Sequence, residues 1–202
     1  MEPVAPRDGA LLSGWLNRPL CRRYALGIFD VAAVRWRDAD GSRERAVHWG
    51  LGWLPDGECD FLGAWLEPEP ASDGPRRLFA DLQARGVERV RRVAGTAVSR
   101  YPERASAAFP GTTVEPSFEG ILADAVAGSH AGGRPSPTRL SEQVRAGLSQ
   151  ALRQRRGFES EPAVLDFFAR ALQRMERRLD RGGLMATRKS RLDPRAPAVA
   201  SS

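Results

Sequence analysis

The chain has 202 residues, of which 42% are hydrophobic and 28% charged, proportions typical of a globular protein with a sizeable core. No apolar run of about 18 residues occurs and residues 1–10 hold no apolar signal segment, so we expect neither a membrane span nor a secretory signal. The formal net charge of +6 points to a polyanionic partner. Only Lys189 among the 31 basic residues is lysine, so arginine-rich coding in a GC-rich genome is an alternative source of this charge.

Two cysteines, Cys21 and Cys59, lie far apart in the chain and fit neither a disulfide framework nor a zinc ribbon. We therefore expect two free thiols and a cytoplasmic protein that does not associate with a membrane.

The first half predicts a sheet. After an irregular lead-in over residues 1–20, residues 24–36 are apolar, β-branched and aromatic, which is typical of a strand buried on both faces. Two further candidate strands follow at residues 45–54 and 59–66, each preceded by a short turn. Three strands joined by short turns predict an antiparallel meander.

The pattern then changes to alternating helices and strands. We expect these elements, in chain order, at residues 73–86 (helix, with Asp73 as its N-cap), 87–93 (strand), 102–109 (helix), 112–115 (strand) and 117–127 (helix). Strands that alternate with helices are expected to lie parallel to the first strand.

The C-terminal part predicts helices. Glycine and proline mark residues 128–138 as a linker, and amphipathic helices follow at 139–156 and 160–181. Residues 182–202 are polar and are expected to be disordered. The element order suits an α/β, ribonuclease H-like fold with a mixed sheet. Its core would span residues 21–127, completed by the helices of 139–181.

Several separated segments resemble the Mutator-type bacterial transposase family. They are Asn17–Leu20 with Tyr24, Ile28–Val31 with Val34–Asp38, Arg45–Gly52, Phe61–Leu66, Leu82–Val90, Tyr101–Glu103, Ala108–Pro110 and Phe158–Glu161. They occur in the family's order over residues 15–180. The resemblance implies a ribonuclease H-like domain that cuts and joins DNA strands with two Mg²⁺ ions held by Asp, Asp and Glu. Carboxylates suit that reaction because Mg²⁺ prefers oxygen ligands and two ions stabilise the attacking and leaving oxygens.

Two of the three carboxylates implied by the resemblance are present. Asp30 stands in the apolar first strand, where a carboxylate is costly to bury without a partner, and we interpret it as a catalytic metal ligand. Glu142 aligns with the glutamate because the sixteen-residue spacing to Phe158 is kept; a glutamate that merely favours the start of a helix is the alternative.

The second aspartate is missing, because the Asp-Gly pair of the family aligns with Ala94-Gly95. Neither Glu88 nor Glu103 is placed to substitute for it. The family's Cys-x-x-His falls at Ser117 and Gly120. The resemblance also implies a helical insertion before the glutamate and an N-terminal DNA-binding region, and we expect this chain to lack both.

We therefore expect an inactive remnant of a transposase catalytic domain. The alternative is a recruited non-enzymatic protein that binds DNA or regulates an intact transposase, and a third hypothesis is an active enzyme with a replacement carboxylate. DNA is the expected partner, with Arg153, Arg155 and Arg156 as candidate phosphate contacts, and an intact transposase or a second copy is a further candidate. His48 and four tryptophans (Trp36, Trp49, Trp53 and Trp65) are interpreted as structural.

Overall fold

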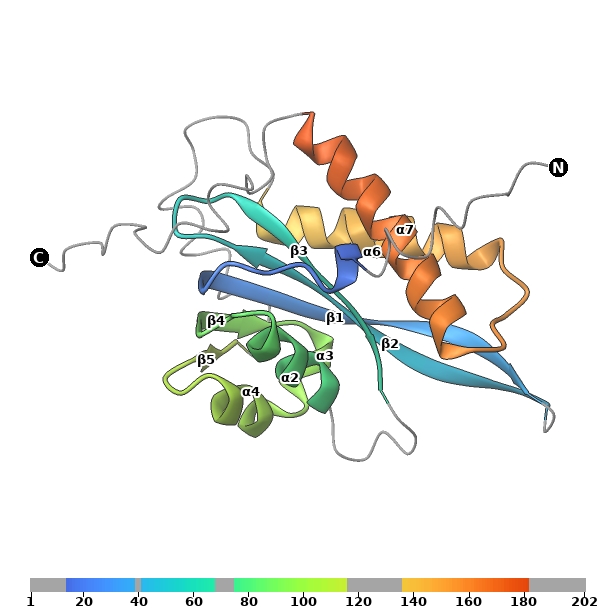
Figure 1. The fold of residues 1–202 in the computed structure, drawn as a ribbon, viewed down its shortest axis with the longest axis horizontal. Helices are drawn as coiled ribbons and strands as arrows, with labels where there is room; N and C mark the ends of the chain where they lie inside the picture. Colours follow the sequence, from blue (N-terminus) through green and yellow to red (C-terminus); the bar gives the residue numbers. More distant parts are fainter. Residues whose placement is uncertain (1–13, 39–40, 68–74, 116–135, 182–202) are drawn as a thin grey trace, which may run out of the picture.

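The computed structural model describes residues 14–38, 41–67, 75–115 and 136–181. In this part of the chain a five-stranded mixed sheet has the order β3-β2-β1-β4-β5, with helices on both sides (Figure 1). The α/β class, the mixture of antiparallel and parallel strands and the C-terminal helices are confirmed, and they are compatible with a ribonuclease H-like fold. The described part contains no helix that is long and apolar enough to cross a membrane.

The predicted meander forms the antiparallel half of the sheet. β1 (Arg23–Asp38) pairs with β2 (Gly41–Trp53), which pairs with β3 (Cys59–Leu66). β1 and β2 extend together well beyond the other strands, at the right of Figure 1. Trp49, Trp53 and Trp65 are buried, which confirms their structural role.

β4 (Arg89–Ala94) runs parallel to β1, and β5 (Thr113–Val114) runs parallel to β4. The connections are α2 (Arg76–Ala84) before β4, and α3 (Thr96–Ser99) and α4 (Pro102–Ala108) after it. The four-residue helix α3 is not predicted by the sequence. The predicted N-cap Asp73, the helix at 117–127 and the tail at 182–202 lie outside the described residues.

Two long helices complete the domain. α6 (Pro137–Arg153) and α7 (Glu161–Asp180) both begin behind a serine, Ser136 or Ser160, whose hydroxyl accepts a backbone N–H of the first turn. Such a cap satisfies one of the unpaired donors at a helix start. α6 begins at Pro137, inside the segment that the sequence predicts as a linker.

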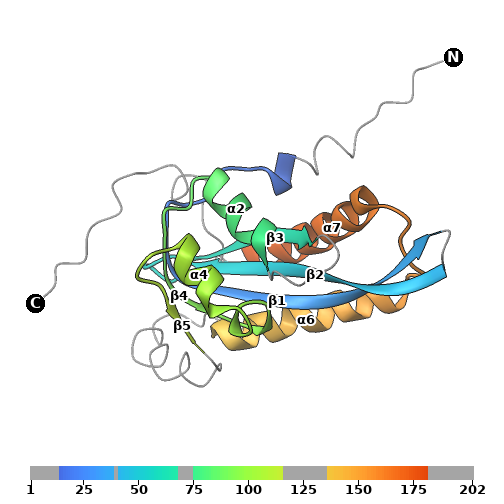
Figure 2. The same cartoon turned by 90° about the horizontal axis from the view of Figure 1, so that it is seen from below.

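The sheet separates two apolar clusters. Ile28 and Val34 of β1 pack with α6 and α7 on one face, whereas Phe29 packs with α2 and α4 on the other. Alternate β1 side chains therefore enter different cores, as expected for a strand with period two. Figure 2 shows α6 running along β1, and Figure 1 shows α2, α3 and α4 grouped near β4 and β5.

Candidate functional site

Asp30 lies in the middle of β1 and is 2% exposed. Its Oδ1 accepts hydrogen bonds from the hydroxyl of Thr96 and, at 2.9 Å, from the backbone N–H of Val31. Its Oδ2 lies 2.7 Å from Nε and 2.5 Å from Nη2 of Arg145. Both carboxylate oxygens therefore have partners, and the buried negative charge is neutralised by a guanidinium.

Ala94 ends β4 beside this carboxylate. It pairs with Ile28 in the parallel register, it is 1% exposed, and both residues belong to the apolar cluster under α6 and α7. Asp30 follows Ile28 by two residues, so Ala94 and Asp30 are on the same face of adjacent strands. A methyl group stands where the resemblance implies the second carboxylate.

Gly95 turns the chain from β4 into α3 and brings Thr96 to Asp30. Its φ is +106°, and a Cβ built on it would lie 2.0 Å from the carbonyl oxygen of Phe29. Only glycine fits a backbone that approaches another backbone so closely. The glycine of the Ala94-Gly95 pair therefore has a role in the fold that does not depend on a metal.

The helix that the sequence predicts at residues 139–156 corresponds to α6, which packs along β1, but the side chain that reaches Asp30 from it is Arg145. Glu142 lies on the same helix, three residues earlier, and is exposed. Residues three apart on a helix are neighbours, so Glu142 lies close to the ion pair without taking part in it. Arg145 could not be found from the sequence, because the resemblance points only to carboxylates and because 115 residues separate the pair.

These residues do not fit a two-ion magnesium site. Asp30 is engaged by Arg145 and Thr96, and its neighbour on β4 is Ala94. Within the described ranges, no group of three or more His, Cys, Asp or Glu side chains could hold a metal ion. Magnesium requires several oxygen ligands in near-octahedral geometry, and the site supplies one carboxylate that already has a counter-charge.

A second buried charge cluster joins the lead-in to the sheet and α7. Arg18 contacts Asp60 of β3 at 3.2 Å and Glu176 of α7 at 3.3 Å, and it also donates to the carbonyls of Trp15 and Phe61. The indole of Trp15 donates to Glu176 at 2.6 Å. Trp15 and Arg18 of the lead-in are therefore bound to the domain by charge and hydrogen bonds.

Tyr24 completes this cluster, because its hydroxyl donates to Oδ2 of Asp60 at 2.9 Å. Burial and the neighbouring Asp60 raise the pKa of Tyr24 well above its ordinary value of 10.0. Burial, with Asp60 and Glu176 nearby, likewise raises the pKa of Cys59 above 9.0. Both groups thus stay protonated at neutral pH. Cys59 and Cys21 are free thiols, as the sequence predicts.

Exposed arginines gather where the β1–β2 hairpin meets the loop between α6 and α7. The loop residue Phe158 donates to the carbonyl of Arg35 at 2.9 Å and accepts from the N–H of Arg37 at 2.8 Å. We define the arginine end by its five exposed members, Arg35, Arg37, Arg153, Arg155 and Arg156. The three predicted phosphate contacts therefore lie beside two arginines of the hairpin, and Arg155 also stacks over the ring of Phe158 at 5.4 Å.

The comparisons with known proteins agree with this fold. A family model described as "Transposase, Mutator family" matches residues 8–118, which include Asp30 and Ala94 and end before α6. The transposase for insertion sequence element ISRM3 of Rhizobium meliloti is 34% identical over 101 residues, covering 50% of this chain and 25% of the relative. A probable ISRM3-like transposase of Sinorhizobium fredii is 33% identical over the same shares. The match spans about a quarter of the length of these curated relatives.

Proposed function

Because this chain belongs to the Mutator family of transposases, we propose that it is a transposase catalytic domain that does not itself cleave DNA. The observation that carries the proposal is the ion pair between Asp30 and Arg145, next to Ala94. A transposase must present free carboxylates to divalent ions, whereas this carboxylate is buried and neutralised. DNA transposition is thus the function of the family, and loss of strand cleavage is the departure that we infer for this chain.

The buried ion pair opposes metal binding energetically. An ion that approached Asp30 would have to displace the guanidinium of Arg145, whose Nε donates a hydrogen bond to Oδ2 and whose Nη2 forms an ion pair with the same oxygen. It would gain only one carboxylate, because Ala94 offers no oxygen. Hydrogen bonds between charged groups are roughly twice as strong as neutral ones, so binding of an ion at Asp30 would forfeit a strong interaction.

We expect the protein to leave supercoiled plasmid DNA intact in the presence of Mg²⁺ or Mn²⁺, with no more nicking than the Asp30→Asn variant. The reason is that one neutralised carboxylate cannot hold two ions. Agarose-gel nicking assays check this. Metal-dependent nicking by the wild-type protein that Asp30→Asn removes would instead establish an active enzyme with a replacement ligand.

A second candidate function, binding of DNA without cleavage, is supported by the arginine end. Its five guanidinium groups are exposed, while Glu44 and Glu159 are the exposed carboxylates described nearby. Arginine side chains on one surface suit the phosphates of a DNA duplex, and the affinity then depends strongly on salt. In this role the protein would act in the cytoplasm, where it would compete with an intact transposase or pair with a second copy.

Changing Arg35, Arg37, Arg153 and Arg156 to glutamine is expected to weaken binding to duplex DNA of any sequence. The slope of log K against log salt should fall by up to about 3.6, because each phosphate that is no longer neutralised lowers it by about 0.9. Arg155 is left in place because it stacks over Phe158 and Phe167. Fluorescence anisotropy at several salt concentrations measures the slope.

The matched control removes the same charge with glutamine at Arg174, Arg177 and Arg178 of α7 and at Arg181 directly after it, all of which are exposed. We expect this variant to keep most of the salt dependence. Equal decreases in the two variants would show that net charge, and not the arginine end, determines the affinity.

A further inference from the structure

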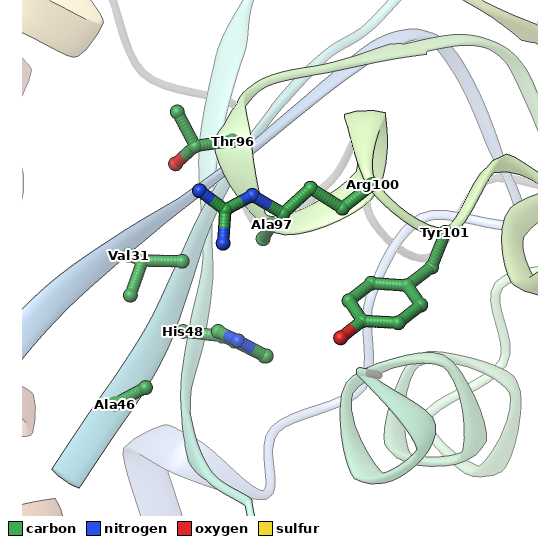
Figure 3. A pocket seen from close by; sticks show the side chains of 7 residues that line it. All are labelled: Val31, Ala46, His48, Thr96, Ala97, Arg100 and Tyr101. Carbon is green, nitrogen blue, oxygen red and sulfur yellow. The ribbon is translucent and has the colours of Figure 1, made fainter. Parts of the chain in front are cut away.

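A pocket of about 340 Å³ opens on the α3 side of the sheet, away from α6 and α7 (Figure 3). Val31 of β1 and His48 of β2, which are cross-strand partners, form its floor. Thr96, Arg100 and Tyr101 line it from α3 and the turn that follows, and two alanines complete the wall. The pocket thus combines small apolar side chains with polar groups that converge from different elements, as ligand pockets do.

His48 is the buried polar group of this pocket. It is 8% exposed, and its Nδ1 lies 3.6 Å from Oε1 of Glu67, too far for a hydrogen bond. Nδ1 has no hydrogen-bond partner in the described structure. Glu67 is itself fixed, because it accepts the backbone N–H groups of Arg77 and Leu78 at 3.3 and 3.4 Å. A buried ring nitrogen without a hydrogen bond is costly, and Nδ1 of His48 is such an atom at the floor of the pocket.

Arg100 and Tyr101 bring the groups that would recognise an anion. Their backbone is held at the end of α3, where the N–H of Tyr101 donates to the carbonyl of Val98 at 3.0 Å. In Figure 3 the guanidinium of Arg100 lies between Thr96 and His48, and the hydroxyl of Tyr101 points toward His48. The described residues provide Arg100 with no carboxylate partner, and its side chain is exposed.

We propose that this pocket binds the phosphate group of a nucleotide. Arginine binds phosphate oxygens through two parallel N–H groups, and the phenol and imidazole supply further donors around the same anion. The apolar wall of Val31, Ala46 and Ala97 suits the sugar or the base. The pocket opens on the α3 side of the sheet, whereas the ion pair of Asp30 with Arg145 faces α6, and Thr96 adjoins both because its hydroxyl donates to Asp30. Binding in the pocket requires neither a metal ion nor strand cleavage.

The two histidines of the chain make the test direct, since ring signals of His48 and His130 can be told apart with a His130→Gln variant. Labelled full-length protein is titrated with thymidine monophosphate, inorganic phosphate or a short 5′-phosphorylated single strand. We expect the chemical shifts of the His48 ring to change as the probe is added and to reach a plateau when the site is saturated. If the strand binds more tightly than the mononucleotide, the phosphate comes from a DNA end. If the two bind equally, the pocket is a site for a free nucleotide.

Two variants distinguish binding in the pocket from nonspecific attraction of the phosphate to the positive charge of the protein. Arg100→Gln should weaken binding of thymidine monophosphate about tenfold or more, because it removes a charge-assisted hydrogen bond to the phosphate. Arg91→Gln removes the same charge from an exposed position on β4 outside the pocket and should bind like the wild type. The proposal is wrong if no probe shifts His48, or if the two variants bind equally well.

Discussion

The Arg18→Met variant is expected to lose about 3–5 kcal/mol of unfolding free energy, the range for breaking a buried ion pair from one side. Arg18 is 12% exposed, Asp60 is fully buried and Glu176 is 14% exposed. Methionine keeps much of the packing volume but removes the guanidinium that contacts both carboxylates. The main cost is therefore the desolvated charge that remains on Asp60.

Urea unfolding followed by tryptophan fluorescence measures this loss, and a double-mutant cycle assigns it. Asp60→Asn keeps an oxygen that can accept from Tyr24 and removes the charge. Combining it with Arg18→Met should cost less than the sum of the single changes, with a coupling of about 1–3 kcal/mol. Additive losses would mean that Arg18 stabilises the domain through packing alone.

A comparable loss, of about 3 kcal/mol or more, is expected for Gly95→Ala, because overpacking and backbone strain act together there. The new methyl group would meet the carbonyl oxygen of Phe29 at 2.0 Å, so β1 and β4 would have to separate beside Asp30. The positive φ of +106° adds backbone strain for any residue with a Cβ. Thermal unfolding measured by circular dichroism is a suitable assay.

Gly111→Ala is the matched control for this substitution. Gly111 also has a positive φ, +80°, but nothing lies within 4 Å of a Cβ built there. We expect a loss of about 1 kcal/mol, from backbone strain alone. If both alanine variants lose the same amount, the close approach to Phe29 contributes nothing.

The sheet could be predicted from the sequence because its strands carry strong local signals. The apolar run that begins at Tyr24 and the turns after the first two strands specify the centres of β1, β2 and β3, although the β1–β2 hairpin extends further than predicted. Helix α3 could not be predicted, since four residues hold no periodicity and its start depends on the turn at Gly95.

The candidate site could be predicted only in part. The cost of burying Asp30 predicts that it has a partner, and the resemblance suggests a metal ion; in the structure the partner is Arg145. Nothing in the local sequence of α6 distinguishes that arginine from the other exposed arginines, because the contact depends on how the helix is seated on β1. The assignments of Asp30 and Glu142 as catalytic ligands remain predictions. Similarly, the lead-in is predicted to be irregular although Arg18 is bound inside the domain.

The cluster around Arg18 connects the start of the described domain to its last helix, α7. The turn that contains Trp15 is bonded to Glu176, so one of the first described segments and the last helix hold each other in place. Neither the segment around Trp15 and Arg18 nor α7 can separate from the sheet without breaking these ion pairs. We therefore expect the segment around Trp15 and Arg18, β3 and α7 to open together, as one cooperative unit.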